Sequence, residues 1–166
     1  MPKTKVLITV KTYPAISAKY DELVCTAGFL EDGTWIRIFP IQFRKKSFEE
    51  QYKKYDWVEI DLVKNTSDFR KESYRPVDYD TEIKIIDHLD TKSNWLLRKE
   101  IVLKNKVYTD IKELIYEAKD RKILTSLAVF KPSNIIDFKI ENVEREWDKK
   151  KLQKLKQDRS SNLFAQ

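Results

Sequence analysis

The stretch DGTWIRIFPIQFRKK (residues 32–46) places two aromatic side chains and an arginine at alternate positions. In a β-strand over residues 35–41, alternate side chains point to opposite faces of the sheet. Trp35, Arg37 and Phe39 would then share one face, with the isoleucines between them on the other. Two rings around a guanidinium can stack the bases of single-stranded nucleic acid. Alternatively, this face packs beneath another layer of protein and Arg37 pairs with an acidic side chain.

Further cations and aromatic side chains lie close to this row in the sequence. They would add phosphate-binding and stacking groups to the same face. The residues predicted to bind nucleic acid are therefore Lys11, Tyr13, Lys19, Tyr20, Trp35, Arg37, Phe39, Arg44 and Lys45. The first functional hypothesis is a non-enzymatic module that binds DNA or RNA.

The net charge of +6 adds little support for this hypothesis, because much of it lies in one short segment. Between Arg145 and Arg159 there are seven basic and three acidic side chains, and the rest of the chain is nearly balanced. Residues 144–166 are predicted to form a charged helix or tail, or a linker to a further segment. A basic segment of this kind is most often a solvated surface.

The only histidine, His88, is the centre of the second hypothesis. A histidine beside carboxylates can transfer protons or bind a metal ion. An enzyme acting on nucleic acid or a nucleotide would use His88 with Asp87 or Glu59. The alternative is a structural hydrogen bond where a strand meets a helix. A third hypothesis is a protein-interaction domain that docks through the Trp35 face or the charged tail.

Cysteine and glycine usage argues against several kinds of site. The only cysteine, Cys25, is expected to be a small buried hydrophobic residue rather than a nucleophile activated by His88. One cysteine and one histidine cannot complete a zinc site without carboxylates, so we expect no metal and no cofactor. Gly28 and Gly33 are the only glycines, which excludes the glycine-rich loops that bind nucleotide phosphates.

Hydrophobic alternation predicts a series of short strands, and a 3.6-residue period predicts two helices. The Asp-Gly pair at residues 32–33 predicts a hairpin turn. Residues 43–54 are expected to form a short helix or loop, and residues 65–80 a surface loop. Helices are predicted at 92–103 and from a cap at Asp110. The predicted strands are 5–13, 22–30, 35–41, 57–64, 81–89, 127–130 and 135–141.

This element order predicts an α+β fold. We expect a small curved antiparallel sheet or partly open β-barrel of about six or seven strands with two to three helices, for example a PUA-like or OB-like barrel. Residues 1–143 would form a single domain. No apolar run is long enough to span a membrane, and a single cysteine suits a reducing compartment, so we expect a cytoplasmic protein. The sequence does not predict an oligomeric state.

KTYPAISAKYDELVCTAG (residues 11–28) and GTWIRIFPIQFR (residues 33–44) together resemble an uncharacterised family of bacterial proteins. The family pattern is KTYP, then KYxExVCxAG, then GxWIRxxPxxFR. The similarity continues through residues 87–103 and 127–141. This family has no established activity, so the resemblance implies no catalytic residues. Its motif does coincide with the face predicted above.

Overall fold

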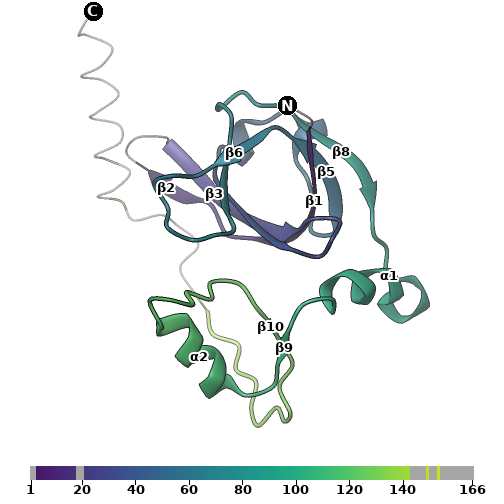
Figure 1. The fold of residues 1–166 in the computed structure, drawn as a ribbon. Helices are drawn as coiled ribbons and strands as arrows, with labels where there is room; N and C mark the ends of the chain where they lie inside the picture. Colours follow the sequence, from purple (N-terminus) through teal and green to yellow (C-terminus); the bar gives the residue numbers. More distant parts are fainter. Residues whose placement is uncertain (1–2, 18–20, 143–148, 150–152, 154–166) are drawn as a thin grey trace, which may run out of the picture.

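A curled mixed sheet built from residues 4–88 forms a partly open barrel in the computed structural model, which describes residues 3–17, 21–142, 149 and 153 (Figure 1). The strand order is β6-β7-β4-β3-β1-β5-β8, and β2 pairs with β3 beside this path. The strands are β1 Thr4–Lys11, β2 Ala15–Ser17, β3 Asp21–Phe29, β4 Trp35–Ile41, β5 Asp56–Ile60, β6 Leu62–Lys64, β7 Ser73–Pro76 and β8 Ile83–His88. The predicted α+β fold with a partly open barrel is confirmed.

The interior of the barrel is filled by the alternating apolar residues of its strands. Ile36 and Ile38 on β4 are each 1% exposed, and they pack with residues of β1, β5 and β8. The core cluster consists of Val6, Ile8, Ile36, Ile38, Ile41, Tyr52, Val58, Ile60 and Ile83. Alternation thus directs the residues between these isoleucines to the outer face of β4.

The β3–β4 hairpin turns at the predicted Asp-Gly pair. Phe29 lies opposite Trp35, and the turn residue Gly33 has a φ of +88°, a left-handed conformation that glycine adopts without a steric penalty. The carboxylate of Asp32 accepts a hydrogen bond from the Thr34 N–H at 2.8 Å. The local sequence is therefore sufficient to position the first residue of β4.

Two predictions between residues 57 and 80 are corrected by the structure. The strand predicted at 57–64 is divided at Asp61, because β5 pairs with β1 and β8 whereas β6 pairs with β7. The loop predicted at 65–80 contains β7, which pairs with β4 in parallel. The sheet is therefore mixed rather than purely antiparallel, since the chain returns to β4 through a loop and not a hairpin.

After the barrel, the chain continues through α1 (Lys92–Val102) into a small unit of β9 (Val107–Tyr108), α2 (Ile111–Lys119) and β10 (Val129–Phe130). Left-handed φ angles at residues 93–95 mean that the regular turns of α1 begin after Trp95. β9 and β10 pair in parallel, and Figure 1 shows this unit beside one end of the barrel.

The C-terminal part of the chain departs from prediction in one respect. The strand predicted at 127–130 corresponds to β10. Residues 135–141 do not form the predicted strand within this chain, because they pair with no described strand. The charged segment predicted at 144–166 lies outside the described residues apart from Lys149 and Gln153.

Residues 43–54, between β4 and β5, contain two short 3-10 helices, η1 Phe43–Lys45 and η2 Phe48–Glu50.

Side-chain contacts join the segment between α1 and β9 to the turn of the β3–β4 hairpin, and the C-terminal unit to the residue before β7. The Asn105 amide donates to the Gly33 carbonyl at 2.5 Å, and the Lys104 ammonium donates to the Glu31 carbonyl at 3.3 Å. The Ser126 hydroxyl donates to the carboxylate of Glu72. None of the helices within the described residues has the length and apolarity that a bilayer crossing requires.

Candidate nucleic-acid interface

The row predicted on the outer face of β4 exists, but its three members have different surroundings. Trp35, Arg37 and Phe39 are all half-buried, and they extend along one strand over about 13 Å at roughly 3.3 Å per residue. Each lies against a different part of the chain. The row is therefore not one continuous open surface.

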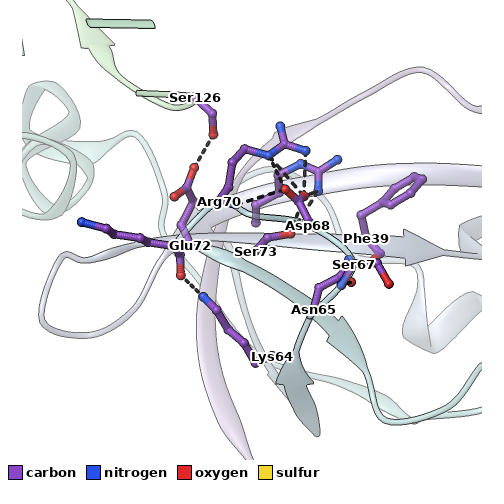
Figure 2. Close-up of polar contacts among 11 residues, drawn as sticks. Phe39, Lys64, Asn65, Ser67, Asp68, Arg70, Glu72, Ser73 and Ser126 are labelled. Atoms are coloured by element: carbon purple, nitrogen blue, oxygen red, sulfur yellow. Dashed lines mark hydrogen bonds and ion pairs between the residues drawn. The ribbon is translucent and has the colours of Figure 1, made fainter. Parts of the chain in front are cut away.

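Arg37, at the centre of the row, forms an ion pair with a loop residue. Its Nη1 donates to the Asp68 carboxylate at 3.0 Å and to the Ser73 hydroxyl at 3.3 Å. The side chains of Arg37 and Asp68 are only 13% and 11% exposed. Asp68 also accepts from the Arg70 guanidinium, at 2.7 Å from Nη2, and from the Ser73 hydroxyl at 2.8 Å (Figure 2).

This buried network explains why residues 65–73 lie against β4. The hydrogen bonds from Arg70 outweigh the effect of burial and hold the pKa of Asp68 well below its usual range. β7 begins at Ser73, opposite Arg37, and the Arg37 N–H donates to the Glu72 carbonyl at 2.8 Å. The guanidinium of Arg37 is thus paired with an acidic side chain, which was the structural alternative for this residue.

Trp35, at the start of β4, lies at the junction with the C-terminal unit. Its ring is 4.0 Å from that of Phe29, centroid to centroid, and Phe29 is fully buried. Trp35 also lines a hollow of about 230 Å³ with residues such as Tyr108 of β9 and Thr125. The indole therefore faces protein on at least two sides.

Phe39, near the other end of β4, opens onto a second hollow, which is larger than the one beside Trp35. This hollow, here called the Phe39 groove, has a volume of about 380 Å³. Its size is within the range of about 300–1,000 Å³ that is typical of small-molecule pockets. The lining residues are Phe39, Pro40, Asn65, Ser67, Arg75, Pro76, Val77, Asp78 and Tyr79. The groove combines two aromatic side chains with amide, hydroxyl, guanidinium and carboxylate groups.

Two polar side chains of the Phe39 groove, Asn65 and Arg75, are held by hydrogen bonds to the backbone. Asn65 donates to the Phe39 carbonyl at 3.4 Å and accepts from the Ser67 N–H at 3.2 Å. Nη1 of Arg75 donates to the carbonyls of Pro76 at 3.2 Å and Val77 at 3.1 Å. Because a guanidinium has five N–H groups, Arg75 can make these bonds and still donate to a ligand.

Three of the other predicted basic residues, Lys11, Arg44 and Lys45, lie at the end of the barrel where β1 and β4 terminate. The Lys11 ammonium donates to the Tyr52 carbonyl at 3.2 Å and lies 3.8 Å from the centroid of the Phe43 ring. Burial lowers the pKa of Lys11. The name basic end is used here for five exposed residues near this end of the barrel: Tyr13, Arg44, Lys45, Lys53 and Lys54.

The basic end and the Phe39 groove are neighbours. Lys46 follows Arg44 and Lys45 in the chain, and its ammonium donates to the Thr81 carbonyl at 2.7 Å. Thr81 is two residues after Tyr79, which lines the groove. The structure therefore brings Phe39, Arg44 and Lys45 into one region and leaves Trp35 at the other end of β4. Lys19 and Tyr20 lie outside the described residues.

A family model with the description Domain of unknown function (DUF8758) matches residues 2–104. The chain belongs to this family. No curated protein and no solved structure matches the chain. The DUF8758 region contains the whole barrel, the Phe39 groove and α1, and it ends before β9. It ends inside the domain predicted at residues 1–143, whose bounds therefore stay a prediction.

Within the DUF8758 region, His88 pairs with a carboxylate that the sequence analysis did not single out. Its Nδ1 lies 2.6 Å from Oδ1 of Asp56, which is directly opposite on β5. Asp87 instead accepts from the His88 backbone N–H at 2.7 Å, and Glu59 lies opposite Lys84. Among the described residues, no three His, Cys, Asp or Glu side chains form a group that could hold a metal ion.

Cys25 lies on β3 of the DUF8758 barrel, which β1 and β5 separate from the strand of His88. Its N–H donates to the Thr12 hydroxyl at 3.0 Å, so its backbone helps to fix the end of β1. Cys25 is half-buried. The imidazole of His88 contacts Asp56 instead. The geometry of the described residues thus gives no support to a Cys25–His88 pair.

Several residues of the site were missed because the sequence carries little signal for them. Asp68, Arg70 and Tyr79 lie in the segment without periodicity that was predicted to be a surface loop. The one signal that the sequence offers for them is composition, since the segment is rich in aspartate, arginine and tyrosine, which form ion pairs and aromatic contacts. Only the parallel pairing of β7 with β4 brings them against Phe39 and Arg37.

Proposed function

We propose that this protein binds single-stranded nucleic acid, with one base in the Phe39 groove and the neighbouring phosphates at the basic end. The observation that carries the proposal is the Phe39 groove itself, a hollow of about 380 Å³ that Phe39 and Tyr79 line together. Aromatic side chains stack on any base, and each stacked base contributes about 1–3 kcal/mol.

The polar groups of the groove suit the edge of a base. A guanidinium such as that of Arg75 donates in a plane, and amide and hydroxyl groups such as those of Asn65 and Ser67 both donate and accept. Arg44 and Lys45 are exposed close by, at the basic end. Arginine and lysine neutralise phosphates, so binding through them weakens as the salt concentration rises.

The first test measures binding of fluorescein-labelled single-stranded oligonucleotides by fluorescence anisotropy. Tyr79→Ala is expected to weaken binding about 5- to 150-fold, because the variant cannot make a stacking interaction worth about 1–3 kcal/mol. The matched control is Tyr116→Ala, which removes a tyrosine that is 66% exposed on α2, outside the groove. Equal weakening by both variants, or no binding by the wild type, would refute the proposal.

A second measurement examines the charges. Replacing Arg44 and Lys45 by glutamine should flatten the plot of log K against log salt by about 0.7 for each phosphate that the variant no longer neutralises. The matched control replaces Arg121 and Lys122, an adjacent and exposed pair in the loop after α2. An unchanged salt dependence in the Arg44/Lys45 variant would show that the basic end does not contact phosphates.

A further inference from the structure

The segment from Asn134 to Asn142 combines the sequence pattern of a strand with the absence of a described partner strand. Ile135, Ile136, Phe138 and Ile140 are 73%, 93%, 81% and 86% exposed. Nothing in the described part of the chain pairs with this segment. Four large apolar side chains within six residues are therefore left in contact with water, which is unusual outside an interaction surface.

The alternation of this segment is that of a strand with one apolar face. Side chains of Ile136, Phe138 and Ile140 would point to one side of a strand, and those of Asp137 and Lys139 to the other. Unpaired backbone groups beside such a face are a template for a second strand. The segment lacks the charge or proline on its apolar face that would oppose such pairing.

The centre of the segment, residues 136–140, is complementary to itself when it is read in the opposite direction, whereas Ile135 at its edge would face Glu141. In an antiparallel pair centred on Phe138, Asp137 of one chain lies opposite Lys139 of the other, and Lys139 lies opposite Asp137. Ile136 lies opposite Ile140 in the same way, and Phe138 lies opposite its own copy. Opposite charges and apolar pairs at facing positions stabilise antiparallel strands, and like charges destabilise them.

Other arrangements of two copies do not share this complementarity. A parallel in-register pair places Asp137 opposite Asp137 and Lys139 opposite Lys139, which is unfavourable. Within one chain, the Lys139 ammonium lies 3.7 Å from the Asp137 carboxylate, and both side chains are well exposed, at 77% and 65%. Such an exposed pair contributes little. The Asp137 carboxylate also accepts an exposed hydrogen bond from the Phe138 N–H at 2.7 Å, and a partner strand would have to replace this bond.

We propose that residues 134–142 pair antiparallel with the same residues of a second copy of this chain, forming a two-fold symmetric dimer centred on Phe138. Each charge pair and each isoleucine pair then occurs twice, as an isologous interface requires. A two-stranded ribbon alone is only marginally stable. The dimer is therefore expected to be weak and to form at micromolar to near-millimolar concentrations. This proposal is independent of nucleic-acid binding.

The test is sedimentation velocity of the full chain over a range of concentrations, with single and double charge reversals. Asp137→Lys and Lys139→Asp each place like charges opposite each other at two positions, so each single variant should be monomeric. The double variant Asp137→Lys/Lys139→Asp restores both pairs and should dimerise as the wild type does. The variants are expected to fold normally because both side chains are exposed, and circular dichroism checks this.

Each outcome decides the question. A wild type that stays monomeric at every concentration would overturn the proposal, as would dimerisation of either single variant. Failure of the double variant to recover the dimer would show that these residues do not face each other in the proposed register. A second measurement is oxidation of Phe138→Cys in a Cys25→Ser background. It should yield a disulfide-linked dimer, because two copies of residue 138 face each other across the axis, and its absence contradicts the register.

Discussion

Replacing Asp68 by asparagine tests whether the buried ion pair keeps the loop of residues 65–73 against β4. Asparagine has nearly the same shape as aspartate but carries no charge. The substitution leaves the guanidinium of Arg37, which is 13% exposed, beside a neutral amide. It also weakens the interactions with Arg70 and Ser73.

The magnitude follows from how much of the network is buried. Removing one partner of a buried ion pair costs about 3–5 kcal/mol of unfolding free energy. Arg70 is 30% exposed and regains water when its partner is removed, so it adds little to this cost. We therefore expect Asp68→Asn to lower the unfolding free energy by about 3 kcal/mol, the low end of that range.

Urea denaturation measures this change directly. With a slope of about 1–3 kcal/mol/M, the midpoint should fall by about 1–3 M. The control is Asp90→Asn, since Asp90 pairs with Lys92 at the surface, where the side chains are 43% and 87% exposed. This control should change stability little. A decrease of less than about 1 kcal/mol in Asp68→Asn would refute the reasoning, because the pair would then be as solvated as a surface pair.

The pH dependence provides a second check with a definite sign. The pKa of Asp68 is lower in the folded protein than in the unfolded chain, where it is about 3.9. The stability that this group contributes is therefore present above that value and is lost as the pH falls below it. The difference in stability between the wild type and Asp68→Asn should be constant near neutral pH and should shrink below about pH 4.

Two further substitutions test the barrel. Gly28→Ala would place a Cβ 1.8 Å from the Leu7 carbonyl oxygen. We therefore expect misfolding or a destabilisation of roughly 3 kcal/mol or more. A melting temperature equal to that of the wild type would contradict the close packing of β1 and β3. Tyr52→Phe removes a buried hydroxyl that lies 2.5 Å from the Thr26 hydroxyl, and the unsatisfied group should cost about 1–2 kcal/mol in thermal denaturation. An unchanged or higher stability would show that this bond is dispensable.

The sequence predicted much of the barrel because strand alternation and turn residues are local signals. The isoleucines of β4 lie on the face opposite Trp35, Arg37 and Phe39, as alternation predicted, and the turn at Gly33 begins that strand at Trp35. The fold class followed from the order of these elements. The outward direction of Trp35, Arg37 and Phe39 was also predictable, since it depends only on the period of a strand.

Only the tertiary structure decided what those outward residues contact. Arg37 pairs with Asp68 because β7 returns to β4 in parallel, and an ion pair between residues 31 positions apart has no local signature. His88 contacts Asp56 for a similar reason, because these two residues are distant in the sequence and only the pairing of β5 with β8 brings them together. The sequence by itself determined which residues face outward, and the contacts between distant strands determined whether those residues are paired within the protein or left open to a ligand.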